Sequence, residues 1–256
     1  MLDKVTPLIL TFDEMPNLQR TLAALDWAKR IVVVDSGSRD GTLELLQSHP
    51  RVALYGRPFD GFASQSEYGL RETGVETDWV LSLDADHVLT PGLVEELRRL
   101  DLPTEVDGLR ARFAYCIQGR RLRGSLYPPR VVLARRQAAR YVQDGHAHRM
   151  VVPGKVLDLV HPILHDDRKP RLRWLQEQSR YAALEAEKLV SSVPADLSLA
   201  DRVRRSVWVA PWLVPLYCLT VKRGLLDGRA GWIYAGERSV AEWMLSLAIC
   251  ERLLRR

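Results

Sequence analysis

The sequence predicts an α/β fold, in which a mostly parallel mixed sheet is flanked by helices and followed by a helical C-terminal extension. Short apolar runs alternate with amphipathic segments through the first hundred residues, as in proteins with a parallel sheet. One of these runs, 79–83, ends abruptly at two carboxylates, Asp84 and Asp86. Beyond residue 168 the pattern becomes helical and basic.

The predicted elements follow from the position of apolar residues, prolines and capping side chains. Strands are expected at 7–11, 31–35, 52–55 and 79–83, with further ones at 108–113 and 130–134. Helices are expected at 16–29, after Asp40, from Thr90-Pro91 onward, and at 172–190. The segment 144–165 reads as loops around short strands.

Composition and charge restrict the classes of protein. The chain has 256 residues, 46% of them hydrophobic, which is enough for a substantial core. Residues 168–256 carry 16 Lys and Arg against 9 Asp and Glu, so we expect an anionic partner for this part, either a membrane surface or nucleic acid. Three scattered cysteines indicate a reducing, cytoplasmic location, and we expect neither a secretory signal nor a spanning helix. The longest apolar run, 207–221, contains two prolines.

Asp84 and Asp86 are the first candidate site. In an open α/β sheet, ligands bind at the carboxyl ends of the strands, which is where these two side chains stand. Carboxylate oxygens suit Mg²⁺ or Mn²⁺, and such an ion commonly binds a substrate diphosphate as well. An Asp-x-Asp pattern also occurs by chance at solvated strand ends, so its context has to decide.

That context is a set of four motifs in order. They are Thr11-Phe12-Asp13-Glu14, the run Val-Val-Val-Asp-Ser-Gly-Ser-Arg-Asp-Gly-Thr at 32–42, Gly-Phe-Ala-Ser-Gln at 61–65, and Leu-Asp-Ala-Asp at 83–86. Over about residues 5–190 the chain resembles the family 2 glycosyltransferases of GT-A fold, in particular the branch with the lipopolysaccharide core β-glucosyltransferases. The resemblance implies an inverting, metal-dependent enzyme that uses a nucleotide-sugar donor, with UDP as the expected nucleotide.

The resemblance also assigns residues to the donor site. Thr11, Asp13 and Asp35 would hold the nucleobase, although the family usually has Asn in place of Asp13. Asp84 would face the ribose. Two further residues, Arg57 and Gln65, would lie where the chain returns across the donor; Arg57 could pair with phosphate or be a solvated arginine. The implied domains are a nucleotide-sugar-binding catalytic domain, 1–168, and a helical extension, 169–256.

Asp86 would bind the metal ion, completed by a histidine near the end of the catalytic domain. His165 is the candidate that the resemblance indicates, and His161 competes with it. His87, where the family commonly has an acidic residue, could support the site or be a surface turn residue.

The residue that deprotonates the acceptor is expected some 50 to 60 residues after the Asp-x-Asp in the family. Asp144 stands at that distance and is the predicted catalytic base. If His146 aligns with the histidine of the family's His-Glu pair, Ala147 replaces the glutamate, and Asp144 or a histidine must act instead. This substitution leaves a catalytically inactive, nucleotide-sugar-binding scaffold as the alternative function.

The C-terminal extension combines basic clusters with tryptophans in apolar runs, which is typical of a helix lying on an anionic membrane. Nucleic acid is disfavoured because the aromatic residues stand inside the apolar runs and no nucleic-acid-binding module is recognisable. A helical bundle that caps the core or forms a homodimer interface is the structural alternative. The predicted acceptor is a hydroxyl of a membrane glycolipid or lipopolysaccharide-type molecule, at the inner face of the cytoplasmic membrane. A dehydrogenase is disfavoured because no Gly-x-Gly-x-x-Gly follows the first strand.

Overall fold

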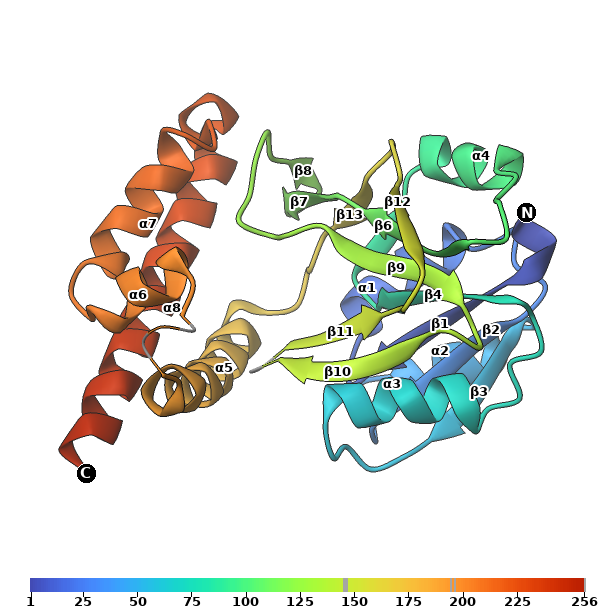
Figure 1. Cartoon of the computed structure of the whole chain (residues 1–256), viewed down its shortest axis with the longest axis horizontal. Helices are drawn as coiled ribbons and strands as arrows, with labels where there is room; N and C mark the ends of the chain where they lie inside the picture. The colour runs from blue at the N-terminus through green and yellow to red at the C-terminus, as the bar shows by residue number, and fades with distance from the viewer. Residues whose placement is uncertain (145–146, 194, 196, 256) are drawn as a thin grey trace. The chain divides into compact units, whose positions relative to one another are not determined.

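A computed structural model describes residues 1–144, 147–193, 195 and 197–255, without the side chains of residues 144 and 147. The chain divides into two compact units (Figure 1). The first contains Met1–Gln118 and Tyr127–Arg168, and the second contains Gly119–Leu126 and Lys169–Arg256.

The first unit is built on a seven-stranded sheet with the order β12-β6-β9-β4-β1-β2-β3. Its strands are β1 (Val5–Thr11), β2 (Ile31–Asp35), β3 (Val52–Gly56), β4 (Trp79–Asp84), β6 (Val106–Ala111), β9 (Arg130–Arg135) and β12 (Lys155–Asp158). Pairing is parallel except at β9, which runs antiparallel to both β4 and β6. The predicted mostly parallel, mixed sheet is therefore confirmed.

Helices cover both faces of this sheet because successive residues of its central strands point to opposite sides. Ile9 of β1 packs in one apolar cluster with Leu18 and Leu93, which belong to α1 (Met15–Ala23) and α4 (Pro91–Arg99). Its neighbour Leu8 packs in a second cluster with Leu70 of α3 (Phe62–Arg71). A short helix, α2 (Thr42–Ser48), adds Leu46 to the first cluster, and a 3₁₀ turn, η1 (Leu2–Lys4), precedes β1.

The first helix is shorter than the periodicity of residues 16–29 predicts. It ends at Ala23, and the chain continues in tight turns in which the Leu25 N–H donates to the Leu22 carbonyl (3.0 Å). These turns bury Leu25 and Ala28, which are 0% and 2% exposed, in the first apolar cluster. The apolar spacing of residues 16–29 therefore indicated which residues are buried, but the residues after Ala23 are not helical.

A second, smaller sheet brings together segments that are distant in the sequence. Strand β13 (Ile163–His165) pairs antiparallel with β5 (His87–Leu89) and parallel with β7 (Phe113–Ile117). In this register His165 lies opposite both His87 and Tyr115. A hairpin of β10 (Arg140–Asp144) and β11 (Ala147–Val151) completes the unit.

The second unit is helical. Its elements are β8 (Arg120–Arg121), α5 (Arg171–Ser191), α6 (Leu199–Arg205), α7 (Ala210–Leu219), η3 (Gly224–Asp227) and α8 (Arg229–Leu254). An apolar cluster of Ala186, Leu189, Leu245 and Ile249 joins α5 to α8. Among the described helices, none has both the length and the apolar character to cross a bilayer.

Candidate active site

Asp35, at the end of β2, is enclosed by hydrogen bonds within the protein. It is 1% exposed, and its carboxylate accepts bonds from the Thr11 hydroxyl (2.7 Å) and the backbone N–H groups of Gly37 and Ser38 (both 2.8 Å). The Ser38 hydroxyl donates a fourth bond. Because a carboxylate has about four acceptor positions, these donors occupy it fully. Asp35 therefore shapes the turn that follows β2, and the nucleobase contacts of Asp35 and Thr11 stay predictions.

Asp13 links this turn to the one after β1. Its backbone is left-handed (φ 52°), a conformation that Asp and Asn adopt more readily than other non-glycine residues. Its N–H donates to Ser38 Oγ (2.7 Å), and its carboxylate accepts the N–H of Arg39 (2.6 Å). Asp can thus hold the loop where the resembled family usually has Asn.

Arg57 and Gln65 contact each other, and Gln65 also contacts the turn that follows β2. Arg57 makes a bidentate pair with Asp60 (both distances 2.6 Å) and also donates to Gln65 Oε1. Gln65 is 1% exposed, and its amide donates to Ser36 Oγ (2.9 Å). The hydrogen bond to Asp60 raises the pKa of Arg57, so its charge is already balanced by a carboxylate.

Asp84 and Asp86 lie at the turn between β4 and β5, as their position in the sequence predicts. The Asp84 side chain is 42% exposed, whereas that of Asp86 is 11% exposed. Burial alone would raise the pKa of Asp84, but electrostatic interactions with His87, His148 and Arg130 outweigh this and lower it. The Asp84 carboxylate is therefore anionic near neutral pH.

His87 is buried, with a side chain that is 4% exposed, so it is not a surface turn residue. Its Nδ1 accepts the backbone N–H of Asp84 (3.0 Å), which assigns the ring proton to Nε2 in the neutral form. Burial lowers the pKa of His87 despite Asp84 and Asp86, which favours that neutral form. Its Nε2 lies 3.5 Å from Asp84 Oδ2 and 3.8 Å from Asp86 Oδ1. His87 is consequently suited to orient the two carboxylates and, with Nε2 protonated, has no lone pair for a metal ion.

His165 lies beside Asp86, with Nε2 3.1 Å from Asp86 Oδ2. Burial would lower the pKa of His165, but the Asp86 and Asp84 carboxylates outweigh it and raise the pKa. One ligand atom from each of Asp86, His87 and His165 falls within 4.8 Å of the others. His161, the competing candidate, is instead half exposed and contacts Glu96 (2.9 Å).

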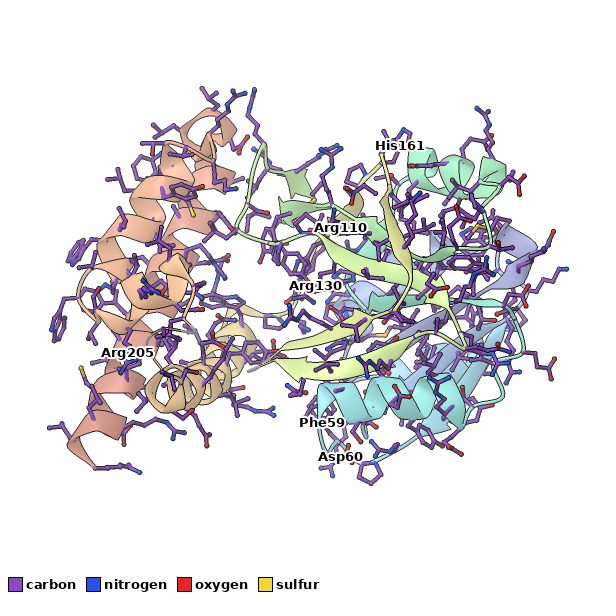
Figure 2. All side chains as sticks on the ribbon, in the orientation of Figure 1. Phe59, Asp60, Arg110, Arg130, His161 and Arg205 are labelled. Atoms are coloured by element: carbon purple, nitrogen blue, oxygen red, sulfur yellow. The ribbon has the colours of Figure 1, made fainter. Side chains whose placement is uncertain are left out.

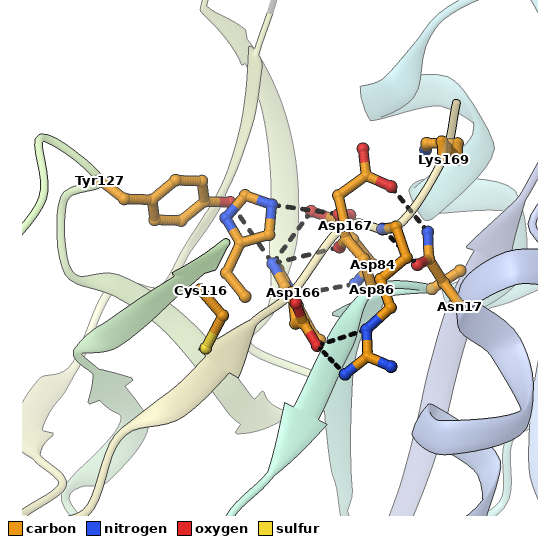
Figure 3. Close-up of polar contacts among 12 residues, drawn as sticks. Asn17, Asp84, Asp86, Cys116, Tyr127, Asp166, Asp167 and Lys169 are labelled. Atoms are coloured by element: carbon orange, nitrogen blue, oxygen red, sulfur yellow. Dashed lines mark hydrogen bonds and ion pairs between the residues drawn. The ribbon is translucent and has the colours of Figure 1, made fainter. Parts of the chain in front are cut away.

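Three polar residues of α1 hold the two metal-site segments together, and sequence reasoning missed them. The Thr21 hydroxyl donates to the Ala85 carbonyl (2.6 Å), and Arg20 pairs with Asp166 (2.6 Å). The Asn17 amide donates to Asp167 (2.8 Å), as Figure 3 shows. Their i, i+3, i+4 spacing puts them on one helix face, which is the available signal. This helix face binds Ala85 and Asp166, the neighbours of Asp86 and His165, and so helps to fix the distance between Asp86 and His165.

Aromatic side chains surround the imidazole of His165. The Tyr127 ring lies 4.5 Å from it and the Tyr115 ring 4.8 Å, measured between ring centroids. The Tyr127 hydroxyl lies 3.5 Å from His87 Nε2 (Figure 3). Burial raises the pKa of Tyr127 well above its usual range, so the phenol stays protonated.

The predicted base, Asp144, ends β10, where its backbone pairs with that of Ala147; its side chain is outside the described part of the chain, as is His146. His148, on β11, stacks on Phe62 with ring centroids 5.7 Å apart. Burial lowers the pKa of His148 although Asp84 opposes this, so its imidazole is neutral and able to accept a proton near pH 7.

The residues at this turn fit a hard divalent cation. A carboxylate oxygen of Asp86 and an imidazole nitrogen of His165 are ligands that Mg²⁺ and Mn²⁺ accept. Carboxylate and imidazole are held in place by different segments, which gives the pair a defined separation before any ion binds.

Comparison with known proteins places this fold and site in a class. Residues 8–152 match the model of glycosyl transferase family 2. The chain is 30% identical over 206 residues to the lipopolysaccharide core biosynthesis glycosyltransferase LpsC of Rhizobium meliloti, covering 72% of this chain and 71% of LpsC. It is also 30% identical over 95 residues to an uncharacterized glycosyltransferase of Rickettsia bellii, covering 37% of this chain and 31% of that protein.

Among solved structures, S. aureus TarS (residues 1–349) in complex with UDP-GlcNAc is similar at a TM-score of 0.49 and 13% identity, over 99% of this chain and 92% of that one. The chain belongs to glycosyl transferase family 2, and its sheet has the GT-A arrangement. It is a glycosyltransferase that resembles the lipopolysaccharide core branch, and a nucleotide-sugar donor goes with that family.

Proposed function

We propose that this protein is an inverting, metal-dependent glycosyltransferase that moves a sugar from a UDP-sugar to a hydroxyl of a membrane glycolipid or lipopolysaccharide-type acceptor. The observation that carries the proposal is the position of Asp86 and His165, 3.1 Å apart beside Asp84 at the carboxyl end of β4. In open α/β sheets this edge is where substrates bind. The likeness to LpsC, a lipopolysaccharide core enzyme by name, supports the class of acceptor.

Each group has a defined task in this proposal. The turns at Asp13 and Asp35 cradle the nucleoside, and Asp84 faces the ribose. Asp86 and His165 would hold Mg²⁺ or Mn²⁺, which would supply positive charge to neutralise the departing diphosphate. His87, with Nε2 3.5 Å from Asp84 Oδ2 and 3.8 Å from Asp86 Oδ1, would support both carboxylates electrostatically.

In the reaction, the acceptor oxygen forms a bond to the anomeric carbon from the face opposite the diphosphate. The bond from that carbon to the diphosphate oxygen breaks, its electron pair stays on the phosphate, and the configuration inverts. The acceptor proton passes to Asp144, the proposed base. His148 is the competing base because its buried imidazole is neutral.

A donor screen tests the function. Thermal shift with UDP-, GDP-, ADP- and dTDP-sugars, each with Mn²⁺ or EDTA, identifies a bound donor because ligands that bind the native state raise Tm. Hydrolysis or transfer of the best donor then tests catalysis. We expect a UDP-sugar to stabilise the protein and to turn over only with Mn²⁺ or Mg²⁺; turnover undiminished in EDTA would contradict metal dependence.

The second unit supplies the membrane contact in this proposal. Large apolar side chains on α7, η3 and the start of α8 are well exposed, among them Trp212 (69%), Leu226 (63%) and Trp232 (58%). Two exposed arginines, Arg223 and Arg229, flank η3. Apolar side chains bordered by cations are typical of surfaces that bind anionic bilayers, here the inner face of the cytoplasmic membrane.

Vesicle co-sedimentation tests the membrane contact with the full chain. The protein should pellet with vesicles of phosphatidylglycerol and phosphatidylcholine, and the double variant Trp212→Glu with Leu226→Glu should stay in the supernatant. Leu172→Glu is the matched control, because Leu172 is equally exposed (68%) on another helix. Equal pelleting of all three proteins would overturn the surface assignment.

A further inference from the structure

Arg130 is the first residue of β9, and the pairing of this strand places it at the edge where the active site lies. β9 runs antiparallel to β4, with Trp79 opposite Arg135 and Leu81 opposite Leu133. Because the two strands run in opposite directions, the beginning of β9 lies at the carboxyl end of β4, next to Asp84. Figure 2 labels Arg130 at the start of this strand.

The electrostatics of the site agree with that position. After burial and His87, which act more strongly, the positive charge of Arg130 is one of the influences on the pKa of Asp84. It likewise contributes to lowering the pKa of His87 and of His148. Arg130 is thus within electrostatic reach of both sides of the site.

The Arg130 guanidinium lies over the Tyr127 ring, with Cζ 4.6 Å from the ring centroid. The same ring lies 4.5 Å from the His165 imidazole, measured between centroids. In the part of the chain that the structure describes, Arg130 makes no ion pair and no side-chain hydrogen bond. A cation–π contact leaves the N–H donors of the guanidinium available for acceptor oxygens.

Arg57, the arginine that the sequence selected for phosphate, differs in this respect. Its guanidinium is bidentate to Asp60 and donates to Gln65 as well. An anion that binds Arg57 must compete with a carboxylate already in place, whereas no carboxylate among the described residues pairs with Arg130. The geometry therefore favours Arg130 as the arginine that meets the donor's phosphates.

We infer that Arg130 binds the diphosphate of the donor and stabilises the nucleoside diphosphate as it leaves. This rests on the proposed function. When the bond from the anomeric carbon to the diphosphate oxygen breaks, its electron pair stays on that oxygen, and the N–H donors of Arg130 bind the added negative charge. A planar guanidinium can donate two parallel N–H bonds to two phosphate oxygens, in a fixed fork geometry that an ammonium lacks. The metal ion of Asp86 and His165 and the guanidinium of Arg130 would then hold the same diphosphate from two sides.

Calorimetric titration with UDP and with uridine separates this role from a general structural one. In Arg130→Ala the Kd for UDP should rise on the order of 10- to 100-fold, as for the loss of charge-assisted hydrogen bonds, both with Mn²⁺ and in EDTA. The Kd for uridine, which has no phosphate, should change less than about twofold if Arg130 contacts only phosphate. Arg130→Lys should lie in between, because the charge remains while the bidentate geometry is lost.

Arg110→Ala is the matched control. Arg110 lies on the neighbouring strand β6, is half exposed and pairs with Asp158 (2.6 Å), so its removal should leave both affinities unchanged. UDP affinity that is the same in wild type and Arg130→Ala would overturn the inference alone. A wild-type protein that binds no nucleoside diphosphate with Mn²⁺ would contradict the proposed function too. Parallel loss of uridine and UDP binding in both Arg130 variants would indicate a role in the fold and overturn the phosphate contact.

Discussion

The two halves of the candidate site are built in opposite ways. On the nucleoside side, Asp35 is 1% exposed and accepts four hydrogen bonds from its own surroundings. At the carboxyl end of β4, Asp84 is 42% exposed, and the guanidinium of Arg130 lies over the Tyr127 ring without an ion pair to any described residue. In the first half, the Asp35 carboxylate has its hydrogen bonds filled by the protein before any ligand binds. The second half carries charges that can interact with a metal ion and with phosphates.

A motif residue can therefore act by shaping the backbone as much as by touching the substrate. Removing a saturated residue such as Asp35 should affect stability, because buried donors lose their acceptor. Removing a residue of the open half should affect binding and catalysis while the fold persists. The following experiments test this division, beginning with the largest expected effect.

Asp86→Ala should lower kcat for sugar transfer by at least about 1,000-fold, because it removes the carboxylate proposed to bind the metal ion. Transfer and donor hydrolysis are measured with saturating Mn²⁺ and UDP-sugar. The far-UV circular dichroism spectrum should match that of the wild type. Near-normal turnover by a folded variant would remove Asp86 from the metal site.

Asp35→Asn should lower the free energy of unfolding by about 1–3 kcal/mol, since an amide cannot accept from all four donors. Thermal or urea unfolding measures the change. The matched variant is Asp84→Asn, whose more exposed side chain should alter stability by less than about 0.5 kcal/mol while turnover falls. Equal stability of the two variants would contradict the distinction between the fully hydrogen-bonded Asp35 and the more exposed Asp84.

The pH dependence of metal binding should follow His165. Its pKa is raised in the folded protein, so the proton is held above the ordinary histidine value and must leave before Nε2 can bind a cation. Mn²⁺ affinity should therefore be constant above that raised pKa and fall by about tenfold per pH unit below it. Calorimetry from about pH 6 to about pH 9 measures this.

His165→Asn is the control for this titration, because an amide carries no titrating proton and its weak Mn²⁺ binding should lose the dependence. The buried, neutral His87 should not contribute in the same range. An affinity that does not change with pH in the wild type would exclude His165 as a ligand.

Arg57→Ala should have the smallest effect, with a Kd for UDP within about threefold of the wild-type value, because Arg57 is paired with Asp60. Titration with UDP under the conditions used for the Arg130 variants makes the two arginines comparable. A loss for Arg57→Ala that exceeds the loss for Arg130→Ala would reverse their assignment.

The sequence predicted those parts of the fold and site that depend on local pattern. The apolar run that ends at Asp84 and Asp86 shows both the buried strand and the carboxylates at its end. Family resemblance supplied His165, which no local pattern links to Asp86. The mostly parallel sheet flanked by helices was predicted correctly, although the first helix is shorter than the predicted 16–29.

What the sequence did not show depends on pairing between distant segments. Residues 130–134 were recognised as an apolar run, but nothing in the run shows that β9 inserts between β6 and β4, which is what places Arg130 beside Asp84. Asn17 and Thr21 look like ordinary polar residues of an amphipathic helix, yet both are buried at 0% exposure. Their role appears only once the segments at 85 and 167 are known to converge on α1.

The addition of β13 to β5 and β7 has a consequence for how the enzyme matures. Asp86 and His165 are 79 positions apart in the chain and meet only after β13 has joined both strands. Such non-local pairing is slow to form because a long loop must close first. High-affinity Mn²⁺ binding should therefore develop late in refolding, after most of the secondary structure. Tight Mn²⁺ binding would then report that β13 has paired with β5 and β7 and that the catalytic unit is completely folded.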